Sequence, residues 1–272
     1  MIALLNIANL AANDGSFAAY VLKLYDSKYT SSNKVNLDFG LSELTPTFDE
    51  VPNIDLPITT AISLKYGFSR ITKKLFYKNF SYHSFEYAFI ENRNSHLIRS
   101  TTDNRLNIWR FGFGWANGYS KKILSKDIEL VHDININWMK TRYPNFSNND
   151  NLSKFIDKWR FGSDFEFGIN IPVHKDIRVE LRKINSLSFY NFKMLPWFLG
   201  FGLDNLLQRW PDLIEEELVS SLNESFPIIL WAYRTFVSYS IYKLRENNSF
   251  WPSKGIQSLS SSGFAINLRF SF

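Results

Sequence analysis

Residues 159–171 read WRFGSDFEFGINI, and large apolar side chains alternate with small or charged ones along this stretch. The odd positions are aromatic or aliphatic except for Ser163, while the even positions carry glycine, asparagine or a charged residue such as Asp164 or Glu166. Successive side chains of a β-strand point to opposite faces, so this pattern predicts a strand with one apolar and one polar face.

The same alternation recurs along most of the chain. It predicts further strands over residues 35–41, 62–69, 84–89, 108–116, 128–138, 177–182 and 264–272. Two more segments, 187–201 and 231–243, bring the expected number to about ten. Several runs reach the roughly nine to eleven residues that a tilted strand needs to cross a membrane, whereas soluble strands average about five or six. A transmembrane antiparallel β-barrel of about ten strands is therefore the expected fold, in the all-β class.

Composition narrows the class of protein further. Hydrophobic residues make up 45% of the 272 residues, yet the mean hydropathy is slightly negative, so the apolar groups must be interleaved with polar ones. The chain has no cysteine, which excludes a disulfide framework, a thiolate metal site and a cysteine nucleophile. The four histidines lack metal-ligand spacing, so we expect neither a metal nor a cofactor. The net charge of +5 is spread through the strands, which argues against a nucleic-acid partner.

The last eleven residues, SGFAINLRFSF, alternate up to a terminal aromatic residue, Phe272. With its long alternating strands, the chain resembles bacterial outer-membrane β-barrel proteins in general, without matching a particular subfamily. The resemblance implies an outer-membrane location, contact with lipid, and Phe272 as the signal read by the barrel-assembly machinery. A mitochondrial or chloroplast outer membrane is the less favoured location. A soluble lipocalin-like barrel would give the same alternation with its two faces reversed.

The chain divides into an N-terminal segment, 1–34, and a barrel over 35–272. The first segment could form a short helix, a plug or an extra strand. Within the barrel, an amphipathic helical insertion is expected over 203–223, on the periplasmic side, because leucines recur there at helical spacing. This helix could lie at the membrane surface, cap the barrel mouth, or dock an envelope protein partner. The docking residues would be Leu206, Trp210, Ile214 and Leu218.

Charged residues fall on the strand faces that a membrane barrel would turn inward. The basic members balance the acidic ones. A barrel of this size has scarcely any open lumen, so we expect these charges to form an ion-pair network across its interior. The expected members are Lys65, Glu86, Arg110, Asp133, Arg160, Asp164, Glu166, Arg178, Glu180, Arg182, Arg234 and Arg269. The competing interpretation is a narrow conduit for small polar solutes or ions.

Two polar residues, His132 and Ser163, stand where the alternation predicts an apolar, lipid-facing side chain. Unpaired polar groups are costly in hydrocarbon, so the two residues could form a catalytic serine–histidine pair like that of outer-membrane phospholipases. That interpretation requires them to lie side by side on adjacent strands. The alternative is that they bond each other or lie under a partner protein.

Three functions follow from these patterns. The leading one is a monomer-sized outer-membrane barrel that acts as a structural or interaction component of the envelope. A channel for small polar solutes is second, and a lipid hydrolase using Ser163 and His132 is third.

Overall fold

The computed structural model describes residues 31–47, 59–73, 78–91, 107–123, 126–142, 153–191, 193–213, 225–252 and 257–272. The N-terminal segment 1–34 that the sequence sets apart therefore lies almost wholly outside the described residues, and β1 begins at Ser31. The strands are β1 (Ser31–Thr47), β2 (Thr59–Lys73), β3 (Lys78–Glu91), β4 (Asn107–Ile123), β5 (Lys126–Arg142), β6 (Trp159–His174), β7 (Ile177–Ser188) and β8 (Leu259–Ser271). Two helices, α4 (Met194–Leu213) and α6 (Phe226–Asn247), lie between β7 and β8.

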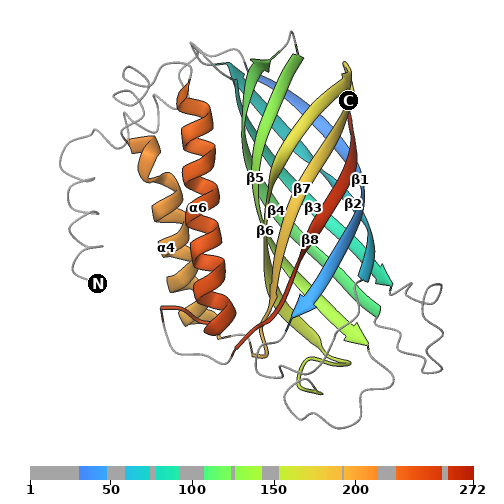
Figure 1. Cartoon of the computed structure of the whole chain (residues 1–272), viewed down its shortest axis with the longest axis vertical. Coiled ribbons are helices and arrows are strands. Elements are labelled where there is room, and N and C mark those ends of the chain that lie inside the picture. The colour runs from blue at the N-terminus through green and yellow to red at the C-terminus, as the bar shows by residue number, and fades with distance from the viewer. Residues whose placement is uncertain are drawn as a thin grey trace.

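The strands form a closed antiparallel barrel in which each strand pairs with its neighbours in the sequence, and β8 returns to pair with β1 (Figure 1). The expected antiparallel barrel is thus confirmed. The expected strand count of about ten is wrong, because the described residues form a ring of eight strands. An eight-stranded barrel is just wide enough for side chains to fill its interior.

The two surplus strands of the sequence analysis are mainly helical. In the segment 187–201, Ser188 ends β7 and Met194 begins α4; the segment 231–243 lies inside α6. Alternating aromatic and β-branched residues made 231–243 resemble a strand. The buried residues of α6 instead include Leu230, Arg234, Val237 and Ile241, which are three or four positions apart and share one helical face.

The helix expected over 203–223 begins earlier, at Met194, and α4 ends at Leu213. Pro211 stands in the last turn of α4, and residues 214–224 lie outside the described residues. Among the described residues, no helix is both long and apolar enough to span a membrane.

The two helices stand beside the barrel and run along its outer surface (Figure 1), where α6 contacts β4, β5, β6 and β7. We call α4 and α6 the helical pair. It follows β7 and precedes β8 at the end of the barrel where the connections are long, such as 48–58 and 143–158. From that end α4 runs back along the barrel, and α6 begins near the end with short turns, where Phe226 and Leu230 pack against Tyr119 of β4. Residues 203–213 of the expected helix therefore lie beside the barrel wall and extend towards the end with short turns, while its placement on the periplasmic side stays a prediction.

Polar residues line the interior of the barrel, and apolar residues cover its outer surface. Along β1, Asn36 and Asp38 are buried inside the barrel, whereas Phe39 and Leu41 are exposed outside it. The outer surface away from the helical pair carries large exposed hydrophobic residues: Phe39, Leu41, Ile62, Leu64, Tyr66, Phe68, Trp109, Phe111, Phe113, Phe264, Ile266 and Leu268. This arrangement is the reverse of that in a soluble barrel.

Candidate functional site

Ion pairs cross the interior of the barrel. The ammonium of Lys65 on β2 lies 2.8 Å from Oε1 of Glu166 on β6, four strands away around the ring, so this pair joins opposite sides of the barrel. Lys65 also lies 3.8 Å from Asp133, the neighbour of Glu166 in the β5–β6 register. Asn135 donates a further hydrogen bond to Glu166. One buried lysine thus separates two buried carboxylates that would otherwise repel each other.

A second group of charges links β1, β7 and β8. The guanidinium of Arg269 holds both carboxylate oxygens of Asp38, at 2.9 and 2.8 Å, and lies 2.9 Å from Glu180. Glu180 also accepts a bond from Arg182 at 3.0 Å. Bidentate arginine–carboxylate contacts are the strongest pairs of this kind. Here they join the last strand to the first, where the barrel closes.

Two further pairs extend the network, so that charged interior residues of seven strands take part in it. Arg110 on β4 lies 2.7 Å from Asp164 on β6, and Arg178 on β7 lies 3.4 Å from Glu129 on β5. Among the expected members, the structure brings together these: Lys65, Arg110, Asp133, Asp164, Glu166, Arg178, Glu180, Arg182 and Arg269. Glu129 and Asp38 belong to the same network.

Three expected members of the network lie elsewhere or are not placed. Arg160 stands at the start of β6, where it donates to the backbone carbonyls of Tyr190 and Lys154. The prediction that Arg234 lies in the lumen is wrong. Arg234 is on α6, outside the barrel, and its guanidinium lies over the ring of Tyr119. The error follows from the misassigned strand 231–243. Glu86 lies on β3, whose side chains fall outside the description, although its backbone pairs with Lys65.

His132 and Ser163 lie apart along the barrel. The β5–β6 register places Ser163 opposite Ile136 and His132 opposite Phe167, so the expected juxtaposition of the two is wrong. His132 instead lies beneath α6, where its Nε2 is 2.8 Å from the hydroxyl of Ser238. A buried imidazole covered by a helix offers no access to a lipid ester, so this geometry does not support the hydrolase.

The contact of His132 belongs to a polar interface between the helical pair and the barrel. Gln208 of α4 donates to the hydroxyl of Ser238 and to the backbone carbonyl of Arg234 on α6. Trp231 of α6 donates its indole N–H to the carbonyl of Val131 on β5 at 3.0 Å. These bonds join α4 to α6, and α6 to the barrel.

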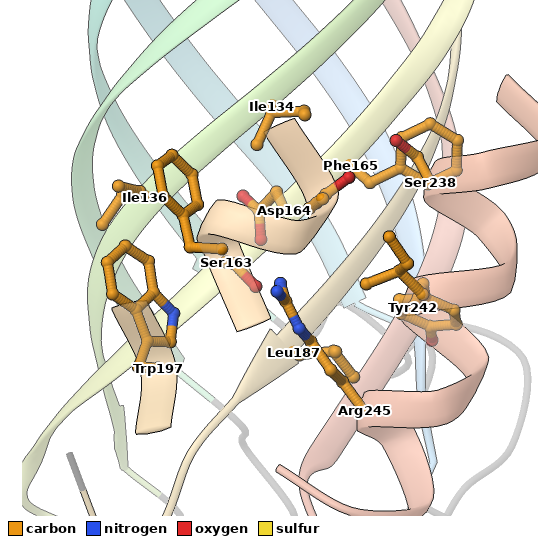
Figure 2. Close-up of a pocket in the computed structure, with 13 residues that line it drawn as sticks. Ile134, Ile136, Ser163, Asp164, Phe165, Leu187, Trp197, Ser238, Tyr242 and Arg245 are labelled. Atoms are coloured by element: carbon orange, nitrogen blue, oxygen red, sulfur yellow. The ribbon is translucent and has the colours of Figure 1, made fainter. Parts of the chain in front are cut away.

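A cavity of about 30 Å³ lies within this interface. Figure 2 shows its lining: Ser163, Asp164 and Phe165 come from β6, Trp197 from α4, and Ser238, Tyr242 and Arg245 from α6. Asp204 also lines it. A cavity of this size has room for one water molecule. Within the described part of the chain, no group of acidic or histidine side chains could hold a metal.

The helical side of this interface was not expected from the sequence; its buried polar residues are Asp204, Gln208, Ser238 and Arg245. A signal was present, because Asp204 and Gln208 are four residues apart on α4, and Arg234 and Ser238 are four apart on α6. Polar residues at that spacing form a polar stripe on one face of a helix. Treating 231–243 as a strand concealed it.

No protein-family model and no curated protein sequence matches the chain. Among solved structures, it is similar to Neisserial surface protein A, with 7% identity and a TM-score of 0.39, over 89% of this chain and 99% of that one. It is also similar to a deletion mutant of the TodX monoaromatic hydrocarbon channel, with 8% identity and a TM-score of 0.21, over 60% of this chain and 51% of that one. Likenesses this distant do not assign the chain to a family.

Proposed function

We propose that this protein is an integral β-barrel of a bacterial outer membrane and a structural or interaction component of the envelope. The observation that carries the proposal is the sidedness of the strands, with charges buried inside and apolar side chains exposed outside. Burying a large apolar side chain gains about 1.5–3 kcal/mol, so a continuous apolar belt facing water would be strongly unfavourable. Hydrocarbon removes that cost.

The dimensions of the strands support the membrane environment. The shortest strand, β7, has 12 residues, and β1, β4 and β5 have 17 each. All exceed the roughly nine to eleven residues required for a tilted crossing. Short turns at one end and long connections at the other are the usual asymmetry of bacterial outer-membrane barrels.

Aromatic side chains gather on the outer surface towards the long-connection end. Phe111 stacks on Trp138 at a centroid distance of 5.5 Å and meets Trp159 edge-on at 5.2 Å. Such a group suits the boundary between hydrocarbon and headgroups, where aromatic girdles of membrane barrels lie.

The filled interior favours a structural role over a conduit. The Lys65–Glu166 pair crosses the middle of the barrel, and the charges around it are already paired with one another. A passing solute would have to break buried ion pairs, each of which costs several kcal/mol to open.

The docking role expected for the helix over 203–223 remains a prediction. Leu206 and Trp210 are exposed on α4, whereas Ile214 and Leu218 lie outside the described residues. Likewise, the side chain of Phe272 is exposed, while its backbone exchanges hydrogen bonds with Val35. Its role in assembly stays a prediction too.

Membrane extraction and gel mobility test the proposal. We expect the full chain, expressed with an outer-membrane export signal, to stay with outer membranes through carbonate and urea washes. Its electrophoretic mobility in unboiled detergent samples should differ from that in boiled ones, because a closed barrel resists detergent unfolding. A chain that is monomeric and folded in buffer without detergent would overturn the proposal.

A further inference from the structure

The helical pair has its polar side turned towards the barrel and its apolar side turned away. Buried polar residues on the inner side are Asp204, Gln208, Arg234, Ser238 and Arg245. The exposed side carries Leu195, Phe198, Leu199, Leu206, Trp210, Ile228, Ile229, Phe236, Tyr239 and Leu244. An amphipathic helix in water shows the opposite arrangement, with polar residues outward.

Three polar groups near the outer side form hydrogen bonds within the pair. The hydroxyl of Ser240 donates to the carbonyl of Phe236, and Asn205 donates to the carbonyl of Phe201. The phenol of Tyr233 on α6 donates to the carbonyl of Leu207 on α4. Back-bonding of this kind is how polar side chains are accommodated where no water is available.

Exposed charges stand near the ends of the helices. Among the helix residues whose side chains are described, the exposed charged ones are Arg209 and Lys243, each one turn before the last residue of its helix. Long basic side chains at such positions can extend to a membrane surface while their stems stay in hydrocarbon. The middle of each helix presents no exposed charge in the described part.

The dimensions and position of the pair match the membrane. With 22 residues, α6 is roughly 33 Å long, close to the thickness of about 30 Å of a bilayer core. It runs along the barrel beside β4–β7 (Figure 1), so its exposed face continues the apolar belt that the other strands present.

From these observations we infer that the α4–α6 pair is embedded in the hydrocarbon layer against the barrel, with its outer face in contact with lipid acyl chains. The polar interface around His132 and Ser238 holds it in place and shields two polar positions of the barrel, His132 and Ser163, from lipid. The inference rests on the proposed membrane location, and the lipid-facing surface that it adds belongs to the two helices and not to the strands.

Spin labels can test the inference, because the chain contains no cysteine and single-cysteine variants need no background changes. Phe236→Cys on α6 and Leu206→Cys on α4 replace residues that are 69% and 63% exposed. Ile62→Cys, at a 62% exposed position of β2, is the matched reference on the barrel belt. Lys175→Cys, in the exposed β6–β7 turn, is the reference for water. Each labelled full-length protein is reconstituted in phosphatidylcholine vesicles.

The readout is the ratio of collision rates with oxygen, which dissolves in hydrocarbon, to those with a water-soluble nickel complex. We expect the ratio at positions 236 and 206 to match that at 62, and to exceed that at 175 by at least about tenfold, because hydrocarbon excludes the polar complex. High nickel access at 236 and 206, with position 62 still oxygen-rich, would overturn the inference and leave the barrel proposal intact. Poor access of both reagents at 236 and 206 would also overturn it, because protein would then cover that face. High nickel access at 62 would overturn the proposed function itself.

Discussion

Replacing Lys65 by methionine tests the sealed interior of the barrel. The substitution keeps most of the side-chain volume but removes the ammonium group that lies 2.8 Å from Glu166 and 3.8 Å from Asp133. Two carboxylates that are neighbours in the β5–β6 register would lose this shared counter-ion. Removing one partner of a buried ion pair costs about 3–5 kcal/mol, so we expect the free energy of unfolding to fall by that amount.

Urea unfolding in lipid vesicles, followed by tryptophan emission, measures the loss. The matched control is Lys175→Met, which removes an exposed ion pair with Asp176 and should change the free energy of unfolding by less than about 1 kcal/mol. The double variant Lys65→Met/Glu166→Met should recover about 1–3 kcal/mol, because only one of the two carboxylates, Asp133, is then left without its counter-ion. A loss for Lys65→Met no larger than the control's would refute the sealed interior.

Three more predictions follow from the interior, the interface and the strand packing. The unmodified protein in planar bilayers should show no single-channel conductance, and steady ion currents would contradict the filled lumen. Ser238→Ala removes the hydroxyl that His132 contacts. The free energy of local opening of α6, measured by amide hydrogen exchange, should therefore fall by about 1–3 kcal/mol. Ser240→Ala, on the outer side, serves as the control, and equal effects of the two would count against the interface. Gly168→Ala should destabilise the barrel by about 1–3 kcal/mol in the same urea assay, because the added methyl group meets the backbone carbonyl of Leu181 on the next strand; unchanged stability would disprove that contact.

Alternation predicted the barrel because one face of each strand must be apolar. The faces of Asp164, Glu166 and Arg269 could be assigned from parity alone, and the structure places all three inside. The partners of these charges could not be assigned, since Lys65 meets Glu166 across the barrel, a contact fixed by its closure and not by neighbouring strands.

The alternation pattern could not predict the helical pair or the register between β5 and β6. Residues 231–243 satisfy a strand period and a helix period at once, and only packing against β4–β7 selects the helix. His132 and Ser163 were correctly recognised as outward polar positions, but their offset depends on the β5–β6 register, which parity does not determine. These positions are polar because a helix with a polar stripe of its own covers them. That helix comes from a different part of the sequence.

The most direct test of the account is to ask which protons surround the methyl groups of Ile62 and Leu268 in lipid nanodiscs. With methyl-labelled protein, the account predicts magnetisation transfer from lipid acyl-chain protons to both methyl groups, whose side chains are exposed on the outer surface. Transfer from water to these methyl groups, with none from lipid, would contradict it.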